Sequence, residues 1–154
     1  MNPKEALKDA VDVRYARVST RAQRQTLPTQ LRDVATKAKA LGYTKKGTPF
    51  SEAASGTRTD RKQLREAIMK ALEMKRKGKN VVFLVRDIQR FSRDSFDLGY
   101  LYKFYPSLNE SLWSNDIPIV ALNDNLVLST KQRPNPNDKL IGGILVGIGG
   151  QEID

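Results

Sequence analysis

Arginines and a serine gather after two apolar runs of the sequence. The first group holds Arg17, Ser19 and Arg21, and the second holds Arg86, Arg90 and Arg93. A guanidinium group binds phosphate oxygens in a bidentate manner and keeps its charge at any working pH. A serine hydroxyl among several of them could attack phosphorus, because the arginines would stabilise charge on the non-bridging oxygens. A Ser-Thr pair after a strand usually forms only a turn or helix cap, so this prediction rests on the combination.

The composition excludes several familiar kinds of site. The 154 residues include no cysteine and no histidine, which excludes a soft-metal site, a disulfide and Ser-His-Asp or Cys-His catalysis. The longest nearly uncharged stretch, Leu140–Gly150, falls short of the roughly 20 residues that a membrane span needs. The N-terminus has no basic stub followed by an apolar block, so we expect no export signal and a cytoplasmic domain.

The positive charge is concentrated in the first half of the chain. The net charge of +10 predicts a polyanionic partner. Residues 1–60 carry 12 basic and 6 acidic side chains, residues 61–80 carry 8 and 2, and residues 81–154 carry 7 and 9. The densest block, residues 70–79, is either a contact to phosphate groups or a solvated helix end whose cations suit the helix dipole.

Alternating strands and helices are expected to position these side chains. The period of two over residues 11–18 and the apolar runs 81–85 and 117–122 predict strands, and residues 49–55 predict a short strand or extended loop. Helical spacing predicts a helix over residues 28–41, with Gly42 as its stop, and a second helix that Thr59 or Asp60 caps and that ends at Gly78. A third helix is predicted over residues 95–113, where Pro106 must kink or divide it. This order predicts an α/β domain with a mainly parallel central sheet flanked by helices. Ligands of such sheets bind beyond the carboxyl ends of the strands, where both arginine groups fall.

Three sequence blocks resemble one family of enzymes. The string from Tyr15 to Thr20, Tyr-Ala-Arg-Val-Ser-Thr, resembles the catalytic signature of the serine recombinases, the resolvase/invertase group. Residues 50–56 with Asp60-Arg61-Lys62 resemble the second block of that family, and residues 90–94 resemble the third. The resemblance covers roughly residues 11–152. It implies a resolvase-like catalytic domain in residues 1–136 and the truncated beginning of a long dimerisation helix in residues 137–154, with no DNA-binding domain in this chain.

The resemblance also implies a role for each matching residue. Ser19 would attack a DNA phosphodiester to give a 5′-phosphoserine link and a free 3′-hydroxyl, with Arg17, Arg90 and Arg93 around the scissile phosphate. The residues implied to support the site or position the phosphate are Tyr15, Gln23, Gln30, Glu52, Arg61, Lys70, Asp87, Gln89 and Glu152. Implied partners are DNA and further copies of the chain, as a dimer and a synaptic tetramer, in a prokaryote, phage or mobile element. Neither a metal nor a small-molecule cofactor is implied.

One position departs from the family pattern. Members commonly have an acid before the first arginine of the third block, where this chain has Gln89. Asp87 would share a face with Gln89 if the chain remains extended there. We hypothesise that Asp87 partly takes over the role of the acid, or that Gln89 keeps the hydrogen bond without the charge.

Two other functions fit the same residues. One is a non-catalytic nucleic-acid-binding α/β domain whose arginines only contact the backbone. The other is a phosphate-binding enzyme that acts on a small nucleotide. Ser19 discriminates the first from a recombinase, because only a recombinase would lose a covalent adduct with DNA when Ser19 is replaced.

Overall fold

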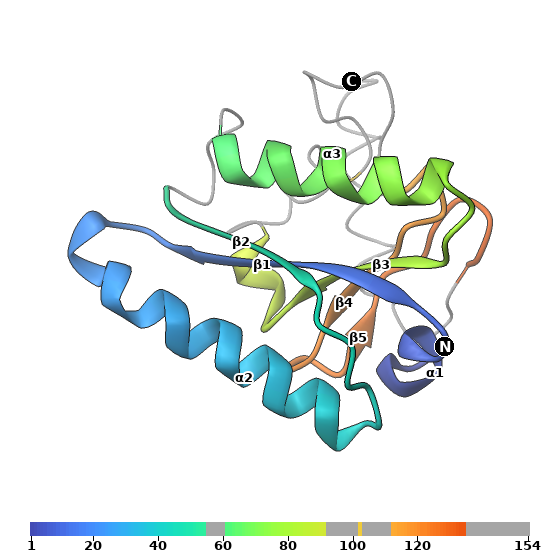
Figure 1. Ribbon diagram of the computed structural model, residues 1–154, viewed down its shortest axis with the longest axis horizontal. Coiled ribbons are helices and arrows are strands. Elements are labelled where there is room, and N and C mark those ends of the chain that lie inside the picture. The colour runs from blue at the N-terminus through green and yellow to red at the C-terminus, as the bar shows by residue number, and fades with distance from the viewer. Residues whose placement is uncertain (55–60, 92–101, 103–111, 135–154) are drawn as a thin grey trace, which may run out of the picture.

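A five-stranded sheet lies at the centre of the computed structural model, which describes residues 1–54, 61–91, 102 and 112–134 (Figure 1). The strand order is β2-β1-β3-β4-β5. The first four are parallel to one another, and β5 is antiparallel to β4. The strands are β1 (Val11–Val18), β2 (Thr48–Ala53), β3 (Val81–Val85), β4 (Ile119–Ala121) and β5 (Leu126–Val127). Because β1 and β3 are parallel neighbours, their carboxyl ends bring Arg17, Arg86 and Arg90 to the same edge of the sheet.

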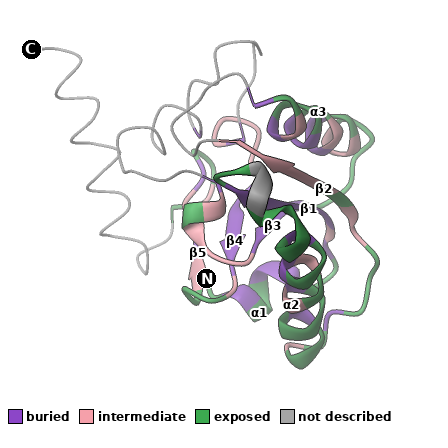
Figure 2. Cartoon of the chain, turned by 90° about the vertical axis from the view of Figure 1, so that its left-hand side faces the viewer, coloured by how far each residue is buried: buried purple, intermediate pink, exposed green. Residues whose placement is uncertain are grey.

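Helices cover both faces of this sheet. Figure 1 shows α3 (Lys62–Arg76) on one face, and α1 (Pro3–Leu7) and α2 (Leu27–Ala40) on the other. Two short 3₁₀ helices, η1 (Arg21–Thr26) and η2 (Ile88–Arg90), follow β1 and β3. The inner strands are buried between the helical layers, while α2 and α3 present exposed residues outwards (Figure 2).

The alternation of side chains along the strands builds a hydrophobic core on each face of the sheet. Val13, Tyr15 and Phe83 pack with Leu64 and Ile68 of α3. On the opposite face the core consists of residues from α1, α2 and the strands, among them Leu7, Val34, Ala38, Val82, Leu84 and Val120. Because both faces of β1 and β3 are covered, the residues at their carboxyl ends are fixed on two sides.

The structure confirms most of the expected elements. The strands at 11–18 and 81–85 have the predicted bounds, residues 48–53 are a strand, and the strand expected over 117–122 is shorter. The two expected helix stops, Gly42 and Gly78, have φ of +87° and +85°, conformations that glycine adopts without strain. The sequence reasoning missed α1 and β5.

Two helix predictions need correction or lie outside the described residues. Arg61 is the N-cap of α3, not Thr59 or Asp60, and it makes no side-chain capping bond. Residues 112–116 form a turn, so the helix predicted over 95–113 does not extend to its expected end. The rest of that helix apart from Tyr102, together with residues 137–154, lies outside the described residues. Among the residues that the structure describes, no helix is long and apolar enough to span a membrane.

Candidate active site

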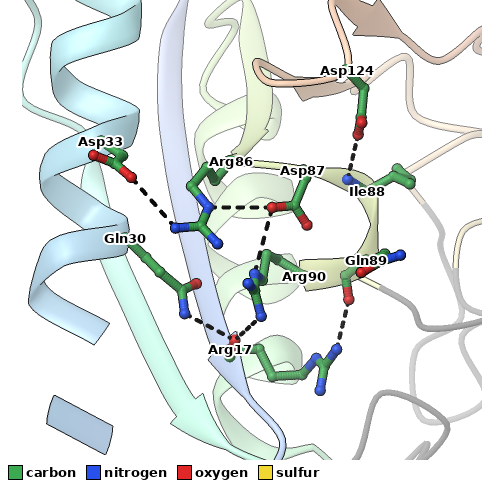
Figure 3. Close-up of polar contacts among 9 residues, drawn as sticks. All are labelled: Arg17, Gln30, Asp33, Arg86, Asp87, Ile88, Gln89, Arg90 and Asp124. Carbon is green, nitrogen blue, oxygen red and sulfur yellow. Dashed lines mark hydrogen bonds and ion pairs between the residues drawn. The ribbon is translucent and has the colours of Figure 1, made fainter. Parts of the chain in front are cut away.

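Arg17 joins three elements at the carboxyl edge of the sheet. Its side chain is only 3% exposed. One terminal nitrogen donates to the carbonyl of Ala54 at 2.9 Å, and the other donates to the carbonyl of Gln89 at 2.7 Å. The Arg17 guanidinium therefore joins the chain after β2 to the η2 segment after β3, and Figure 3 shows its bond to Gln89.

The carbonyl of Arg17 is held in turn by two side chains from different elements. Gln30 of α2 donates Nε2 to it at 3.3 Å, and Arg90 of η2 donates a terminal nitrogen at 3.1 Å (Figure 3). Gln30 is 3% exposed, so its amide is fixed by the packing of α2 against β1. Gln30 and Arg90, both predicted site residues, thus meet at the carbonyl of Arg17, two residues before Ser19.

Ser19 lies just beyond the end of β1 and is exposed to solvent. The loop that presents it is held by local bonds of η1. The hydroxyl of Thr20 donates to Oε1 of Gln23 at 3.3 Å, and the hydroxyl of Thr26 donates to the carbonyl of Gln23 at 2.8 Å. A hydroxyl that is open to solvent, at the end of a strand with a fixed backbone, is accessible to a large phosphodiester substrate.

Asp87 supplies a carboxylate to the arginine cluster. Its Oδ2 lies 3.2 Å from Nε of Arg86 and 3.6 Å from Nε of Arg90 (Figure 3). Arg86 also reaches Oδ2 of Asp33 on α2 at 3.4 Å. Asp124, in the turn between β4 and β5, accepts the backbone N–H of Ile88 at 2.7 Å, at the start of η2. Carboxylates from three parts of the chain therefore contact Arg86, Arg90 and the start of η2.

The premise for pairing Asp87 with Gln89 on one extended face is wrong. Residues 88–90 form the 3₁₀ helix η2, and Asp87 is its N-cap residue. Gln89 is exposed, and its contact with Arg17 is made by its backbone carbonyl. That Asp87 takes over the role of the missing acid stays a prediction, with its ion pair to Arg90 in its favour.

Glu52, Tyr15 and Arg61 brace the adjoining end of α3. The Glu52 carboxylate accepts the Tyr15 hydroxyl at 2.6 Å and the backbone N–H groups of Gln63 and Leu64, both at 3.1 Å. Arg61 is 1% exposed, donates to the carbonyl of Phe91, and lies over the Tyr15 ring with its guanidinium carbon 5.5 Å from the ring centre. Burial is the main cause that raises the pKa of Tyr15 far above its ordinary value, so this hydroxyl stays protonated and donates. These contacts position the chain on both sides of the site.

The remaining predicted residues lie apart from this cluster or outside the described residues. Lys70 pairs with Glu73 on the same helix at 3.8 Å. Within the basic block of residues 70–79, Lys77 also pairs with Glu73, at 3.2 Å, and Lys75 lies 4.0 Å from Asp116. Arg93 and Glu152 lie outside the described residues. No group of His, Cys, Asp and Glu suited to a metal ion occurs within the described part of the chain.

The sequence matches a family model over almost its whole length. The model is described as the resolvase N-terminal domain, and it matches residues 13–149. The chain belongs to the resolvase family. A comparison with curated protein sequences found no match.

Solved structures of recombinase catalytic domains resemble this resolvase-family chain. The N-terminal catalytic domain of TP901-1 integrase has a TM-score of 0.60 at 24% identity, over 92% of this chain and 95% of that chain. A resolvase family site-specific recombinase from Streptococcus pneumoniae has a TM-score of 0.59 at 16% identity, over 93% and 90%. The C-terminal catalytic domain of ISC1926 TnpA, an IS607-like serine recombinase, has a TM-score of 0.54 at 26% identity, over 72% of this chain and 67% of that chain.

The predicted resolvase-like fold is confirmed. The family assigns the chain to the catalytic domains of site-specific serine recombinases, and a purely nucleic-acid-binding domain is not favoured.

Two residues of the site were not singled out from the sequence, and Arg86 was grouped with the other arginines without a role of its own. Asp124 stands in an Asn-Asp-Asn turn between two apolar runs, a pattern typical of a hairpin loop near a sheet edge. Asp33 gave no signal, because an acid on the polar face of a helix is indistinguishable in sequence from a solvated one.

Proposed function

We propose that Ser19 is the nucleophile of this recombinase domain and that its substrate is a DNA phosphodiester. The serine Oγ–P bond forms as the P–O3′ bond breaks, and the proton lost by the serine is balanced by the one that the 3′ oxygen gains. The products are a 5′-phosphoserine link and a free 3′-hydroxyl. Since one phosphodiester replaces another, religation by the reverse reaction needs no external energy source.

The observation that carries the proposal is the convergence of Arg17, Gln30 and Arg90 at the backbone before Ser19. Arg17 lies on β1 and Arg90 on η2, which follows the neighbouring parallel strand β3, and Arg90 donates to the carbonyl of Arg17 at 3.1 Å. Two guanidinium groups at the same sheet edge as the exposed Ser19 would provide the charge that stabilises the non-bridging oxygens of a pentacoordinate phosphorus. We propose Arg93 as a third member of this group and Gln23 as a support of the serine loop.

The partners follow from the family and from the charge. Resolvase-family recombinases act on DNA as assemblies, and the +10 net charge favours a polyanion. We therefore propose double-stranded DNA and further copies of this chain as partners, in the cytoplasm of a prokaryote that carries a phage or mobile element. Tyr15, Glu52 and Arg61 act by positioning α3 and η2.

The test is the formation of a covalent protein–DNA adduct. The chain is linked through a flexible segment to a DNA-binding module of known site, and incubated with duplexes whose paired sites flank a randomised central segment. The linkage raises the local DNA concentration to about the millimolar range. We expect a denaturant-resistant adduct with the wild type, and mass spectrometry after nuclease trimming places the phosphate on Ser19. Ser19→Ala abolishes the adduct and leaves the salt-dependent DNA affinity unchanged.

Two results would contradict this assignment. An adduct that persists in Ser19→Ala, or that maps to Thr20, would show a different nucleophile. Salt-sensitive DNA binding without any adduct from the wild type would favour the non-catalytic nucleic-acid-binding domain.

A further inference from the structure

Arg86 lies between two carboxylates that come from different parts of the chain. Its Nε is 3.2 Å from Oδ2 of Asp87, in its own segment, and its terminal nitrogen is 3.4 Å from Oδ2 of Asp33, on α2 (Figure 3). The same Oδ2 of Asp87 is 3.6 Å from Nε of Arg90. The four side chains therefore form a continuous series, Asp33, Arg86, Asp87 and Arg90, from a helix surface to the active-site arginine.

The last link of this series depends on charge. Nε of Arg90 and Oδ1 of Asp87 are buried atoms without a hydrogen-bond partner among the described residues. At 3.6 Å the Arg90–Asp87 contact is an ion pair longer than a good hydrogen bond. The guanidinium of Arg90 is thus held toward the Arg17 carbonyl partly by the position of the Asp87 charge, and Arg86 fixes that position from the other side.

We propose that Asp33 and Arg86 are positioning residues for Arg90. They anchor Asp87 to α2, so that its carboxylate keeps the Arg90 guanidinium aligned at the Arg17 carbonyl, two residues before Ser19, although position 89 supplies no acid. The proposal rests on the function proposed above, because it concerns the same phosphate-binding arginine. It assigns part of the alignment of η2 to a residue on the surface of α2.

The charge of Asp33 allows this role to be separated from a general electrostatic effect. Its side chain is 45% exposed, so its replacement should leave the core intact. If Asp33 acted only through the overall field, its removal would increase DNA affinity and speed adduct formation, since DNA repels carboxylates. The positioning role predicts the opposite sign for the rate.

The experiment measures the rate of adduct formation at saturating DNA and the DNA concentration that gives half of that rate, with the linked protein and duplexes described above. Asp33→Asn should lower the saturated rate about two- to five-fold, which corresponds to a partly exposed ion pair. The half-saturating concentration should stay unchanged or fall. Asp33→Glu should retain most of the rate. Glu66→Gln, which removes one charge from an exposed position of α3, serves as the matched control and should leave the rate unchanged.

Two further variants test the order of the series. Arg86→Gln should lower the saturated rate by at least as much, and the double variant with Asp33→Asn should be no slower than Arg86→Gln alone, because the two residues act in sequence. Thermal unfolding checks that each variant is folded, and Asp33→Asn carries the test alone if Arg86→Gln is not.

The failure of this inference is distinguishable from that of the proposed function. An adduct with the wild type, together with equal rates for Asp33→Asn and Glu66→Gln, would overturn the positioning role and leave Ser19 chemistry in place. A faster rate for Asp33→Asn would also overturn it. The absence of any adduct with the wild type would overturn the proposed function and this inference with it.

Discussion

The carboxylate of Glu52 at the end of β2 accepts the hydroxyl of Tyr15 from β1 at 2.6 Å. The same carboxylate accepts two backbone N–H groups in the first turn of α3, and so caps a helix whose own N-cap residue is an arginine without a capping bond. A negative charge at this end also suits the helix dipole. One side chain therefore joins two strands and a helix next to Arg61, at the border of the site.

Replacement of Glu52 should destabilise the fold strongly. Glu52→Ala leaves a buried tyrosine hydroxyl and two helix N–H groups without their acceptor, and we expect a loss of about 2–4 kcal/mol in the free energy of unfolding. Glu52→Gln keeps one oxygen acceptor and should lose less. Tyr15→Phe removes only the hydroxyl and should cost about 1 kcal/mol. Urea unfolding measures all three, and a loss in Glu52→Ala no larger than in Tyr15→Phe would contradict the capping role.

Gly47, in the connection to β2, approaches a buried carboxylate. A Cβ at this position would lie 1.9 Å from Oδ2 of Asp12. Asp12 has little room to shift, because it is buried and bonded to Arg14 at 2.9 Å and to the Tyr43 hydroxyl at 2.5 Å. Gly47→Ala should therefore cost about 2 kcal/mol or more, through overpacking against a buried ion pair.

Gly42 is the matched control for this prediction. A Cβ there meets nothing within 4 Å, but its φ is +87°. Gly42→Ala should cost only about 1 kcal/mol, from the left-handed backbone alone. Thermal or urea unfolding of both variants gives the comparison, and equal losses would mean that Asp12 can move away.

The sequence predicted the strands better than the ends of the helices. The runs at 11–18 and 81–85 have the expected bounds because an uninterrupted apolar or alternating pattern between charged residues leaves few alternatives. The start of α3 was not predictable, since its capping group comes from Glu52, ten residues before the helix and on another element. The short α1 and the two-residue β5 carry too few residues for a periodic signal.

The site was predictable in its arginines but not in what holds them. The position of Arg17 and Arg90 follows from parallel strands that end at one edge. The link from Asp33 to Arg86 joins residues 53 positions apart, and no local pattern in either segment predicts it. The turn into η2 also moved Gln89 away from Asp87, which an extended chain would not have done.

Stability should fall at alkaline pH because of two buried tyrosines. Burial, with a hydrogen bond to a carboxylate in each case, raises the pKa of Tyr15 and of Tyr43 well above the ordinary value of about 10. The unfolded chain loses these protons near pH 10 while the folded chain keeps them. The stabilisation is therefore fully present below pH 10 and declines above it by about 1.4 kcal/mol per pH unit for each tyrosine.

The alkaline decline can be assigned with a single variant. Tyr15→Phe removes one of the two contributions, so its free energy of unfolding should fall less steeply than that of the wild type between pH 9 and pH 11. Lysines also titrate in this range, but they are the same in both proteins. Identical slopes would show that the Tyr15 hydroxyl ionises in the folded protein.

Asp124 should matter for the site as an acceptor and not as a charge. Its Oδ2 accepts the N–H of Ile88 at 2.7 Å and so fixes the first residue of η2, the helix that carries Arg90. Asp124→Asn retains an acceptor oxygen and should preserve both stability and the rate of adduct formation within about two-fold. Asp124→Ala removes the acceptor, and we expect a loss of about 1 kcal/mol in the free energy of unfolding together with a slower adduct rate at unchanged DNA affinity. If Asn and Ala variants were equally slow, the charge of Asp124 would be the property that η2 requires, and the hydrogen bond to Ile88 would not explain the alignment of Arg90.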